Sequence, residues 1–366
     1  MNIIHYAGIS ANEASGVSVV VPQIINAQAE LMNICFYNYG KTSFSIDDKI
    51  LSFNCEHNDD YHTFPEPFNK PDIVVFHSPF GIRRSVNVAE SLRRDGIPYV
   101  VVPHGCFSLR ALKKKALKKF FAMHFFFRKM FSQAAAVQFL SEGEKNSSKY
   151  KEKGVVIPNG ISIPDAYQRK EIGDGIKLSF IGRKDIYHKG LDLLIEACAK
   201  IHSCLKENDV KIYLYGPYEN NPKEIKTLIS ENKVDDIVFD LPAVFGEDKK
   251  SVFLNTDVVV LTSRFEGFPC VLLEAWSYGC PTLLTKGTNL GDEAVKHNCG
   301  WCTENDVQNI ANVILSVIRD KDKIEEKAKA ARKYVSANYS WSVIAKRYFN
   351  MYIDIYFKRC KNVSNK

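Results

Sequence analysis

The sequence has no long apolar run, and its first residues do not have the pattern expected of a secretory leader. No stretch approaches 18 consecutive apolar residues, so we expect no membrane-spanning helix. Residues 1–6 lack a basic region followed by a long apolar one, and they resemble a first strand instead. The ten cysteines are scattered through apolar segments, as in a reduced cytosolic protein rather than a disulfide scaffold. The sequence therefore predicts a cytoplasmic location.

Two further features limit the ligands that the protein is expected to bind. No Asp-x-Asp metal signature stands at the end of a strand-like run, and the pairs at 59–60 and 235–236 look like surface carboxylates. We therefore expect a protein that uses neither a metal nor another cofactor. The net charge of +7 is a mild excess, and much of it is local to one segment, so we expect no nucleic-acid partner.

What the sequence does have is a regular alternation of apolar, strand-like runs with helix-length segments. The expected strands are residues 3–7, 34–37, 73–77, 99–103, 135–140, 155–157, 177–181, 211–215, 237–239, 257–261 and 282–284. The expected helices are residues 81–95, 109–133, 190–202, 222–232, 269–278 and 306–318. Continuous apolar strands separated by helices indicate parallel sheets covered on both faces. The sequence predicts an α/β fold of two doubly wound, Rossmann-like domains that face a cleft.

The domain boundary is expected where the strand pattern pauses. Residues 159–175 are rich in proline, glycine and charge, and apolar strands resume directly after them. We therefore expect an N-terminal domain at 1–165, a second domain at 166–340, and a last helix at 341–366 that packs back on the first domain.

The most informative stretch runs from Ser263 to Ala275. It follows an apolar run, turns at Glu266-Gly267-Phe268-Pro269, and opens a helix. Proline is tolerated at a helix start, and the free N–H groups there form an anion site. Glu266 precedes the helix and Glu274 lies about two turns along it, so a diphosphate could lie between two hydroxyl-binding carboxylates, as in a nucleotide-sugar. The alternative is a pair of solvated glutamates on an ordinary helix.

Three other motifs follow strand-like runs, where open α/β sheets bind ligands. The polar loop that ends at Gly16 could admit a phosphate, or it could simply turn. His104, between Pro103 and Gly105, could bond a sugar hydroxyl, or it could satisfy loop backbone. Arg183 and Lys189 bracket a strand-to-helix turn and suit a diphosphate, with surface charge as the alternative.

Together these residues resemble a known family. The chain is similar to the retaining glycosyltransferases of family 4, the group 1 enzymes with the two-domain GT-B fold. The shared pattern is Glu266 through Glu274 with Ala275, a Glu-x7-Glu motif, joined to Gly182-Arg183 and Lys189-Gly190. The Pro103-His104-Gly105 turn, Pro158-Asn159-Gly160 and Gly216 match in order and spacing. One departure is Ser15-Gly16, where the family often has a Gly-Gly pair.

The resemblance implies a role for each matching residue. Arg183 and Lys189 would contact the donor diphosphate and stabilise it as it leaves, Glu274 would bind the ribose, and His104 would face the reacting sugar. Glu266 with the backbone of Gly267, Phe268 and Pro269 would hold the donor sugar. The remaining implied contacts are the N–H groups of Cys270, Val271 and Leu272 on phosphate, Gly16 and Gly216 near the donor, and Val244 near the base.

The resemblance also implies the reaction. Such an enzyme would move a hexose-type sugar from a nucleotide-sugar to a saccharide or lipid-linked saccharide in cell-surface polysaccharide synthesis, with retention and without a metal. UDP is favoured over GDP as the commoner nucleotide among relatives. A nucleotide-sugar epimerase or hydrolase on the same fold is the alternative.

A basic, aromatic segment points to a membrane surface. Residues 110–129 hold eight Lys or Arg side chains and no acid, together with five phenylalanines. Such a helix suits an anionic membrane, and we expect peripheral attachment at the cytoplasmic face through Lys113, Lys114, Lys115, Lys118 and Lys119. In the alternative, the aromatic side chains are core and the lysines are solvated.

One motif is expected to be a decoy. Cys299-Gly300-Trp301-Cys302 has the form of a redox Cys-x-x-Cys. A redox motif of that kind should follow an early strand and open a helix. This one comes late and precedes a loop, so we expect no thiol chemistry from it.

Overall fold

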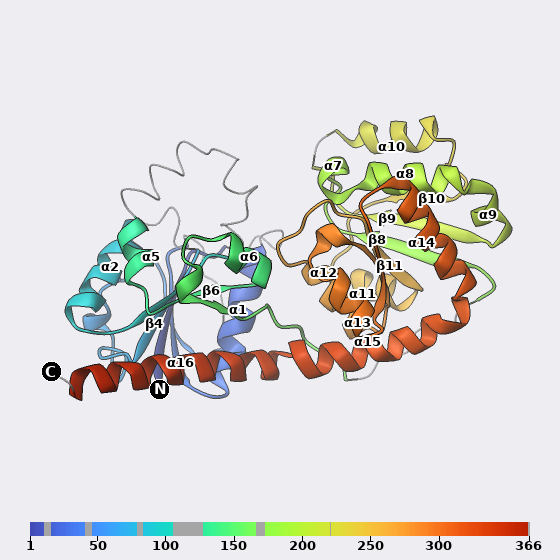
Figure 1. Ribbon diagram of the computed structural model, residues 1–366. Helices are drawn as coiled ribbons and strands as arrows, with labels where there is room; N and C mark the ends of the chain where they lie inside the picture. Colours follow the sequence, from blue (N-terminus) through green and yellow to red (C-terminus); the bar gives the residue numbers. More distant parts are fainter. Residues whose placement is uncertain are drawn as a thin grey trace. The chain divides into compact units, whose positions relative to one another are not determined.

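The computed structural model describes residues 1–10, 16–40, 46–78, 83–104, 127–165, 173–219 and 221–364. The chain forms two compact units. Unit 1 comprises Met1–Gly160 together with Trp341–Lys366, and unit 2 comprises Ile161–Ser340. Each unit is built around one parallel sheet (Figure 1).

Within its described residues, unit 1 holds a sheet in the order β3-β2-β1-β4-β5-β6-β7, with every pair parallel. Its strands are β1 (Asn2–Ala7), β2 (Asn33–Asn38), β3 (Leu51–Phe53), β4 (Ile73–His77), β5 (Tyr99–Val102), β6 (Ala136–Phe139) and β7 (Gly154–Val156). Its helices are α1 (Gly16–Ala29), α2 (Arg83–Arg94), α5 (Arg128–Gln133), α6 (Glu142–Ser147) and α16 (Trp341–Ser364).

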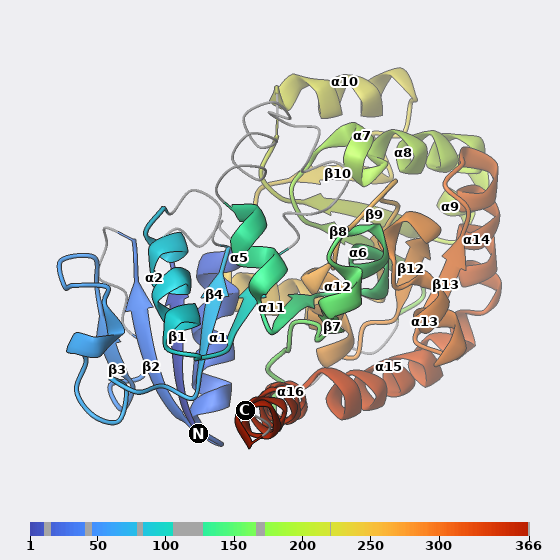
Figure 2. The same ribbon diagram turned by 60° about the vertical axis from the view of Figure 1, so that its left-hand side comes forward.

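Alternate residues of these strands enter two different cores. Ile3, Ile73 and Val75 pack with Ile24 of α1 and Tyr348 of α16 on one face of the sheet. On the other face, a second apolar cluster joins the strands to α2 and α5. This period of two is what a central strand buried on both faces requires, and Figure 2 shows α2 and α5 in front of the sheet.

Unit 2 repeats the same plan, with the order β10-β9-β8-β11-β12-β13, again all parallel within the described residues. Its strands are β8 (Ile176–Ile181), β9 (Val210–Tyr215), β10 (Val238–Leu241), β11 (Val258–Leu261), β12 (Thr282–Thr285) and β13 (Gly300–Thr303). Its helices are α7 (Ile186–Lys189), α8 (Leu191–Lys200), α9 (His202–Glu207), α10 (Pro222–Glu231), α11 (Gly246–Leu254), α12 (Cys270–Ser277), α13 (Gly291–Lys296), α14 (Val307–Arg319) and α15 (Ile324–Tyr339).

The predicted fold class is confirmed: both units are parallel α/β sheets with helices around them. Two strands were not predicted, β3 and β13. The predicted Cys-x-x-Cys decoy overlaps β13, which pairs in parallel with β12. Burial raises the pKa of the Cys299 thiol to about 12, which disfavours the thiolate form that redox chemistry uses.

Candidate functional site

The sheet of unit 2 reverses its winding between β8 and β11. Strand β8 lies between β9 and β11, so the connections that leave β8 and β11 run to opposite sides of the sheet. Such a switch point opens a crevice at the carboxyl ends of the strands, and open α/β sheets bind their ligands there. The loops after β8 and β11 carry Arg183, Lys189 and the motif around Glu266.

The loop after β8 is packed tightly against the end of β9. A Cβ atom on Gly216 would lie 1.8 Å from the carbonyl oxygen of Gly182, so only glycine permits this approach. Arg183 follows, with its side chain about half exposed, and Nη1 donates to Glu219 Oε2 at 2.6 Å. A guanidinium has five N–H donors, so this ion pair leaves Arg183 able to bind an anion as well.

The next residue, Lys184, is fully buried. Its Nζ forms an ion pair with Asp240 Oδ1 at the end of β10 and donates to the carbonyl oxygen of Leu241 at 2.6 Å. Its Nζ also lies 4.4 Å from the ring centroid of Tyr218, whose hydroxyl donates to Asp240 Oδ2 at 2.6 Å. Lys184 therefore ties the loop after β8 to the start of residues 241–245, the segment in which half-buried Val244 lies.

The loop after β8 is also joined to the loop after β11. Gly190 caps the C-terminus of helix α7, adopts the left-handed conformation at φ 61°, and would place a Cβ 2.1 Å from the carbonyl oxygen of Thr262. The Thr262 hydroxyl donates to the carbonyl oxygens of Lys189 and Gly190 at 3.1 and 2.9 Å. These contacts bring Lys189 beside the motif that follows β11.

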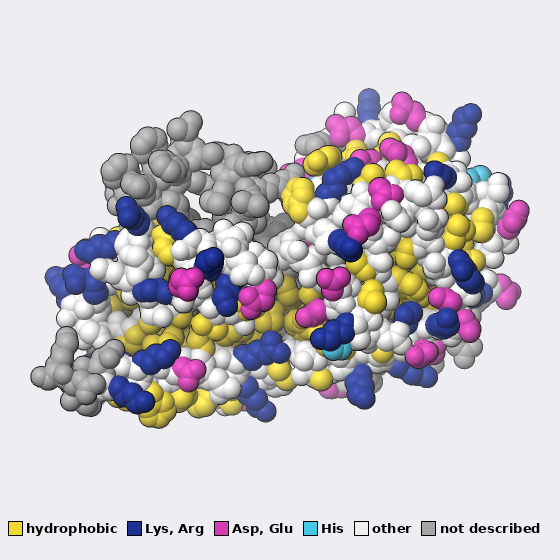
Figure 3. All heavy atoms as spheres, viewed as in Figure 1, with side chains coloured by type: hydrophobic (Ala, Val, Ile, Leu, Met, Phe, Trp, Pro, Cys, Tyr) yellow, Lys and Arg dark blue, Asp and Glu magenta, His cyan; other side chains and the backbone are white. Residues whose placement is uncertain are grey.

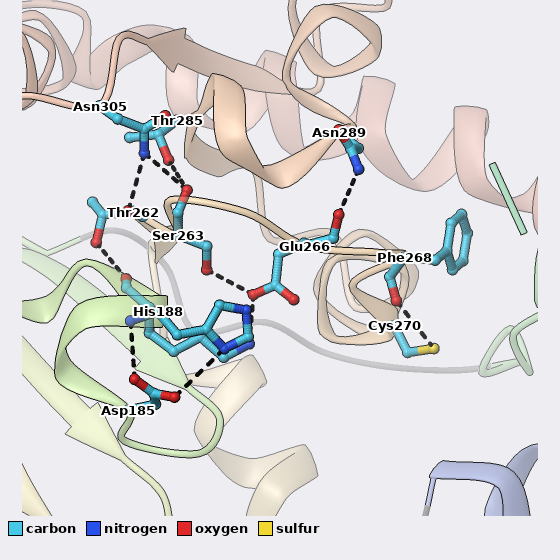
Figure 4. A network of polar contacts seen from close by, with 11 residues as sticks. Asp185, His188, Thr262, Ser263, Glu266, Phe268, Cys270, Thr285, Asn289 and Asn305 are labelled. Atoms are coloured by element: carbon cyan, nitrogen blue, oxygen red, sulfur yellow. Dashed lines mark hydrogen bonds and ion pairs between the residues drawn. The ribbon is translucent and has the colours of Figure 1, made fainter. Parts of the chain in front are cut away.

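Lys189 and Glu266 form the central contact of the site. Lys189 Nζ lies 2.5 Å from Glu266 Oε1, and the two side chains are only 14% and 10% exposed. The same oxygen accepts a hydrogen bond from the Ser263 hydroxyl at 2.7 Å (Figure 4). Because the pair is largely shielded from water, each charge depends on the other for its stabilisation. One ammonium N–H bonds Glu266, and the other two are suited to an anion.

Further hydrogen bonds fix the backbone around Glu266. Its N–H donates to the carbonyl oxygen of Gly287 at 2.7 Å, and Asn289 Nδ2 donates to its carbonyl oxygen at 2.5 Å. The carbonyl oxygen of Ser263 accepts from Thr285 Oγ1 at 2.9 Å and from Asn305 Nδ2 at 2.8 Å (Figure 4). The turn is therefore held by β12 and by the residues after β13, and Glu266 is positioned before any ligand binds.

Helix α12 begins directly after this turn. Gly267 and Phe268 lie in the turn and Pro269 is the N-cap, so the amino end of the helix, with its partial positive charge, is next to Glu266 in the sequence. Cys270, Val271 and Leu272 form the first turn. The Leu272 N–H donates to the carbonyl oxygen of Pro269 at 3.0 Å, so it is already engaged within the turn.

Glu274 lies further along α12 and pairs with Lys249 of α11. Both side chains are rather less than one-third exposed. The sequence patterns did not single out Lys249, because it is distant in the chain from every motif. The pair places a carboxylate and an ammonium together on neighbouring helices that follow β10 and β11.

Two predicted site residues lie in unit 1. Gly16 is the first residue of α1, and residues 11–15 before it fall outside the described residues. His104 follows β5, adopts the left-handed conformation at φ 50°, and its Nε2 lies 2.8 Å from Nδ1 of His77. Gly105, which completes the predicted Pro-His-Gly turn, also falls outside the described residues.

The predicted membrane segment lies almost wholly outside the described residues. Lys113, Lys114, Lys115, Lys118 and Lys119 all fall in the gap between 104 and 127. Over the described part of the face in Figure 3, Lys and Arg side chains are interspersed with Asp and Glu. Among the described helices, none is both long and apolar enough to cross a bilayer. In the same residues, no group of three His, Cys, Asp or Glu side chains is arranged to hold a metal.

The fold is that of the GT-B glycosyltransferases. HepE of Anabaena, solved in complex with UDP, superposes with a TM-score of 0.71 at 18% identity, covering 96% of this chain and 99% of that one. The same protein, solved with UDP-glucose, superposes with a TM-score of 0.65. WaaG, a glycosyltransferase involved in lipopolysaccharide biosynthesis, superposes with a TM-score of 0.63 at 16% identity, covering 94% and 98%.

Sequence comparison matches part of the chain to a family model and to known glycosyltransferases. Residues 165–334 match the family model described as glycosyl transferases group 1. An uncharacterised glycosyltransferase of Methanocaldococcus jannaschii is 31% identical over 189 residues, which are 50% of this chain and 47% of that protein. The chain spans about half the length of the curated relatives that it matches.

Proposed function

We propose that the protein transfers a sugar from a UDP-sugar to a saccharide or lipid-linked saccharide, with retention and without a metal. The observation that carries the proposal is the shielded Lys189–Glu266 pair at the switch point of unit 2. It presents a cation for a departing diphosphate beside a carboxylate for sugar hydroxyls. The UDP and UDP-glucose complexes of HepE support this choice of donor.

In this proposal, cations rather than carboxylates stabilise the charge that develops during the reaction. Lys189 and Arg183 bind the diphosphate and stabilise the negative charge that grows on it as the sugar leaves. The amino end of α12 adds partial positive charge. Glu266 anchors the sugar and holds the Lys189 ammonium in place, while Glu274 binds the ribose. The two glutamates therefore do not act as the acid and nucleophile of a retaining hydrolase.

We further propose a hexose-type donor sugar and a role in cell-surface polysaccharide synthesis. The likeness of the fold to WaaG supports this setting. The proposal is tested with a panel of UDP- and GDP-sugars, read first by thermal shift, because a bound ligand stabilises the native state. Transfer is then followed by nucleotide release in excess EDTA, with and without saccharide acceptors. Release that needs no acceptor would indicate a hydrolase, and activity that requires added manganese would contradict metal independence.

Replacing Glu266 is expected to impair turnover, whereas replacing Glu274 is expected to impair UDP binding. Glu266→Gln keeps the shape of the side chain but removes the charge that orients Lys189, so we expect turnover to fall about tenfold or more while UDP binding persists. Glu274→Ala should instead weaken UDP binding by about tenfold, the cost of a lost charged hydrogen bond. Calorimetry with UDP and the nucleotide-release assay measure the two effects. A Glu274→Ala variant that binds UDP normally would show that the ribose assignment is wrong.

Attachment to an anionic membrane surface is proposed from the composition of residues 110–129. Each basic residue near such a surface contributes on the order of 1 kcal/mol, so several together would hold the protein at a vesicle. We expect co-sedimentation with anionic vesicles that is lost when Lys113, Lys114, Lys115, Lys118 and Lys119 become Glu, and that weakens with salt. Equal sedimentation of the two proteins would rule out this surface.

A further inference from the structure

A continuous row of hydrogen-bonded side chains runs through unit 1 from a buried glutamine to His104. Gln28 Oε1 lies 3.2 Å from His5 Nε2, His5 Nδ1 lies 2.9 Å from His77 Nε2, and His77 Nδ1 lies 2.8 Å from His104 Nε2. The ring planes of His5 and His77 are 17° apart and their centroids are separated by 5.2 Å. Every contact in the row is within hydrogen-bonding distance.

The sheet explains why these side chains meet. His5 of β1 and His77 of β4 share the strand face of Ile3 and Val75, which α1 covers, and Gln28 lies on α1. Gln28 and His5 are 0% exposed and His77 is 1% exposed. Polar groups buried in an apolar core are costly unless they are bonded, so the row is maintained by its own hydrogen bonds.

All three imidazoles are neutral near pH 7. Burial lowers the pKa of His5 to about 3 and the pKa of His104 to about 4. Burial, and then the proximity of the other two histidines, place the pKa of His77 well below its ordinary value. A neutral imidazole carries one N–H and one lone pair. The direction of every hydrogen bond in the row is therefore set by whichever group lies at its end.

In the orientation that the Gln28 amide has in this structure, its carbonyl oxygen stands at that end and can only accept. His5 must donate to it from Nε2, so His5 Nδ1 is an acceptor and takes a hydrogen from His77 Nε2. His77 Nδ1 in turn accepts from His104 Nε2. Nδ1 of His104 is then left with a lone pair, and no other described residue hydrogen-bonds to that atom.

We propose that Gln28, acting through His5 and His77, holds His104 in the Nε2–H tautomer, so that its Nδ1 accepts a hydrogen bond from a hydroxyl group of the donor sugar. The identity of the ligand rests on the proposed function, whereas the tautomer does not. An acceptor nitrogen suits a neutral hydroxyl and is repelled by phosphate or carboxylate oxygens. Gln28, His5 and His77 are positioning residues, since they act on the ligand only through His104.

The tautomer can be read directly in the full-length protein. Long-range proton–nitrogen correlation spectra of histidine-labelled protein distinguish Nε2–H from Nδ1–H rings, and His104→Gln identifies the His104 signals by their loss. We expect the Nε2–H form for His104. An Nδ1–H ring in the wild-type protein would overturn the proposal, without bearing on whether the protein is a glycosyltransferase.

Gln28→Met tests the origin of the tautomer. Methionine fills a similar volume but offers His5 no strong acceptor, and an unpaired buried N–H is costly. The row should therefore reverse, so that His104 becomes Nδ1–H. Gln138→Met is the matched control: Gln138 is also buried in unit 1, donates to the carbonyl oxygen of Ile157 at 2.6 Å and accepts from Tyr348 at 2.9 Å, but it lies outside the row. Its variant should leave the His104 signals unchanged.

The rate of UDP release from UDP-glucose provides a second test of the proposal. We expect kcat/KM for UDP release to fall up to about tenfold in Gln28→Met, the worth of one hydrogen bond, with UDP affinity and the Gln138→Met rate nearly unchanged. Gln28→Leu is the second variant if Gln28→Met does not fold. An unaltered His104 tautomer in both Gln28 variants would overturn the role of Gln28. Failure of the wild-type protein to use UDP-glucose would count against the donor, while the spectra would still decide the tautomer.

Discussion

Replacing Lys189 with methionine should lower sugar transfer by about 10²–10³-fold, the effect of removing one preorganised group that stabilises developing charge. Methionine keeps the length of the side chain but removes the cation that faces Glu266. The structure predicts a second effect, because Glu266 is only 10% exposed and would keep a charge with no cation beside it. We expect the free energy of unfolding to fall by about 3–5 kcal/mol. Nucleotide release and urea unfolding measure the two losses.

A second variant separates these losses. In Lys189→Met with Glu266→Gln neither charge remains, so we expect most of the stability to return while transfer stays lost. Lys286→Met is the matched control, because Lys286 pairs with Glu304 of the same unit and both side chains are more than half exposed. It should change stability by at most about 1 kcal/mol. A Lys189→Met protein with normal turnover would disprove the assigned role of Lys189.

The sequence was informative where local pattern and position coincide. Glu266 and Lys189 could be singled out because each follows a continuous apolar run, and the carboxyl ends of parallel strands meet along one edge of a sheet. The structure brings the two side chains together across 77 positions of chain. Val258–Leu261 and Ile176–Ile181, the strands that lead to them, were both predicted from their apolar runs.

Partners that lie far apart in the sequence could not be predicted in the same way. Nothing near Lys184 indicates that it pairs with Asp240, 56 positions away, and a lysine after a strand is usually solvated. Strand β13 was missed because its few residues resemble a redox motif, and β3 because three residues give no period. The histidine row needs three strands and a helix to be in register, and only coordinates can show that.

The buried Lys184–Asp240 pair leads to the second large expected effect. The Lys184 side chain is 0% exposed and that of Asp240 is 6% exposed. Among the described residues, Lys184→Met would therefore leave the buried carboxylate with the Tyr218 hydroxyl as its remaining side-chain partner. We expect a loss of about 3–5 kcal/mol, which corresponds to roughly 10 °C in Tm for a unit of this size. Residues 241–245 would lose their tie to the loop after β8, so UDP affinity should fall as well.

The control and the compensating variant follow from the same geometry. Lys211→Met on β9 removes an exposed pair with Asp209 and should change stability by no more than about 1 kcal/mol. Lys184→Met with Asp240→Asn removes both buried charges, keeps a partner for Tyr218, and should recover most of the lost stability. UDP affinity should stay low in this double variant, because the hydrogen bond from Lys184 to the Leu241 carbonyl is still absent. Recovery of both stability and affinity would show that Lys184 balances a charge and does not position the segment in which Val244 lies.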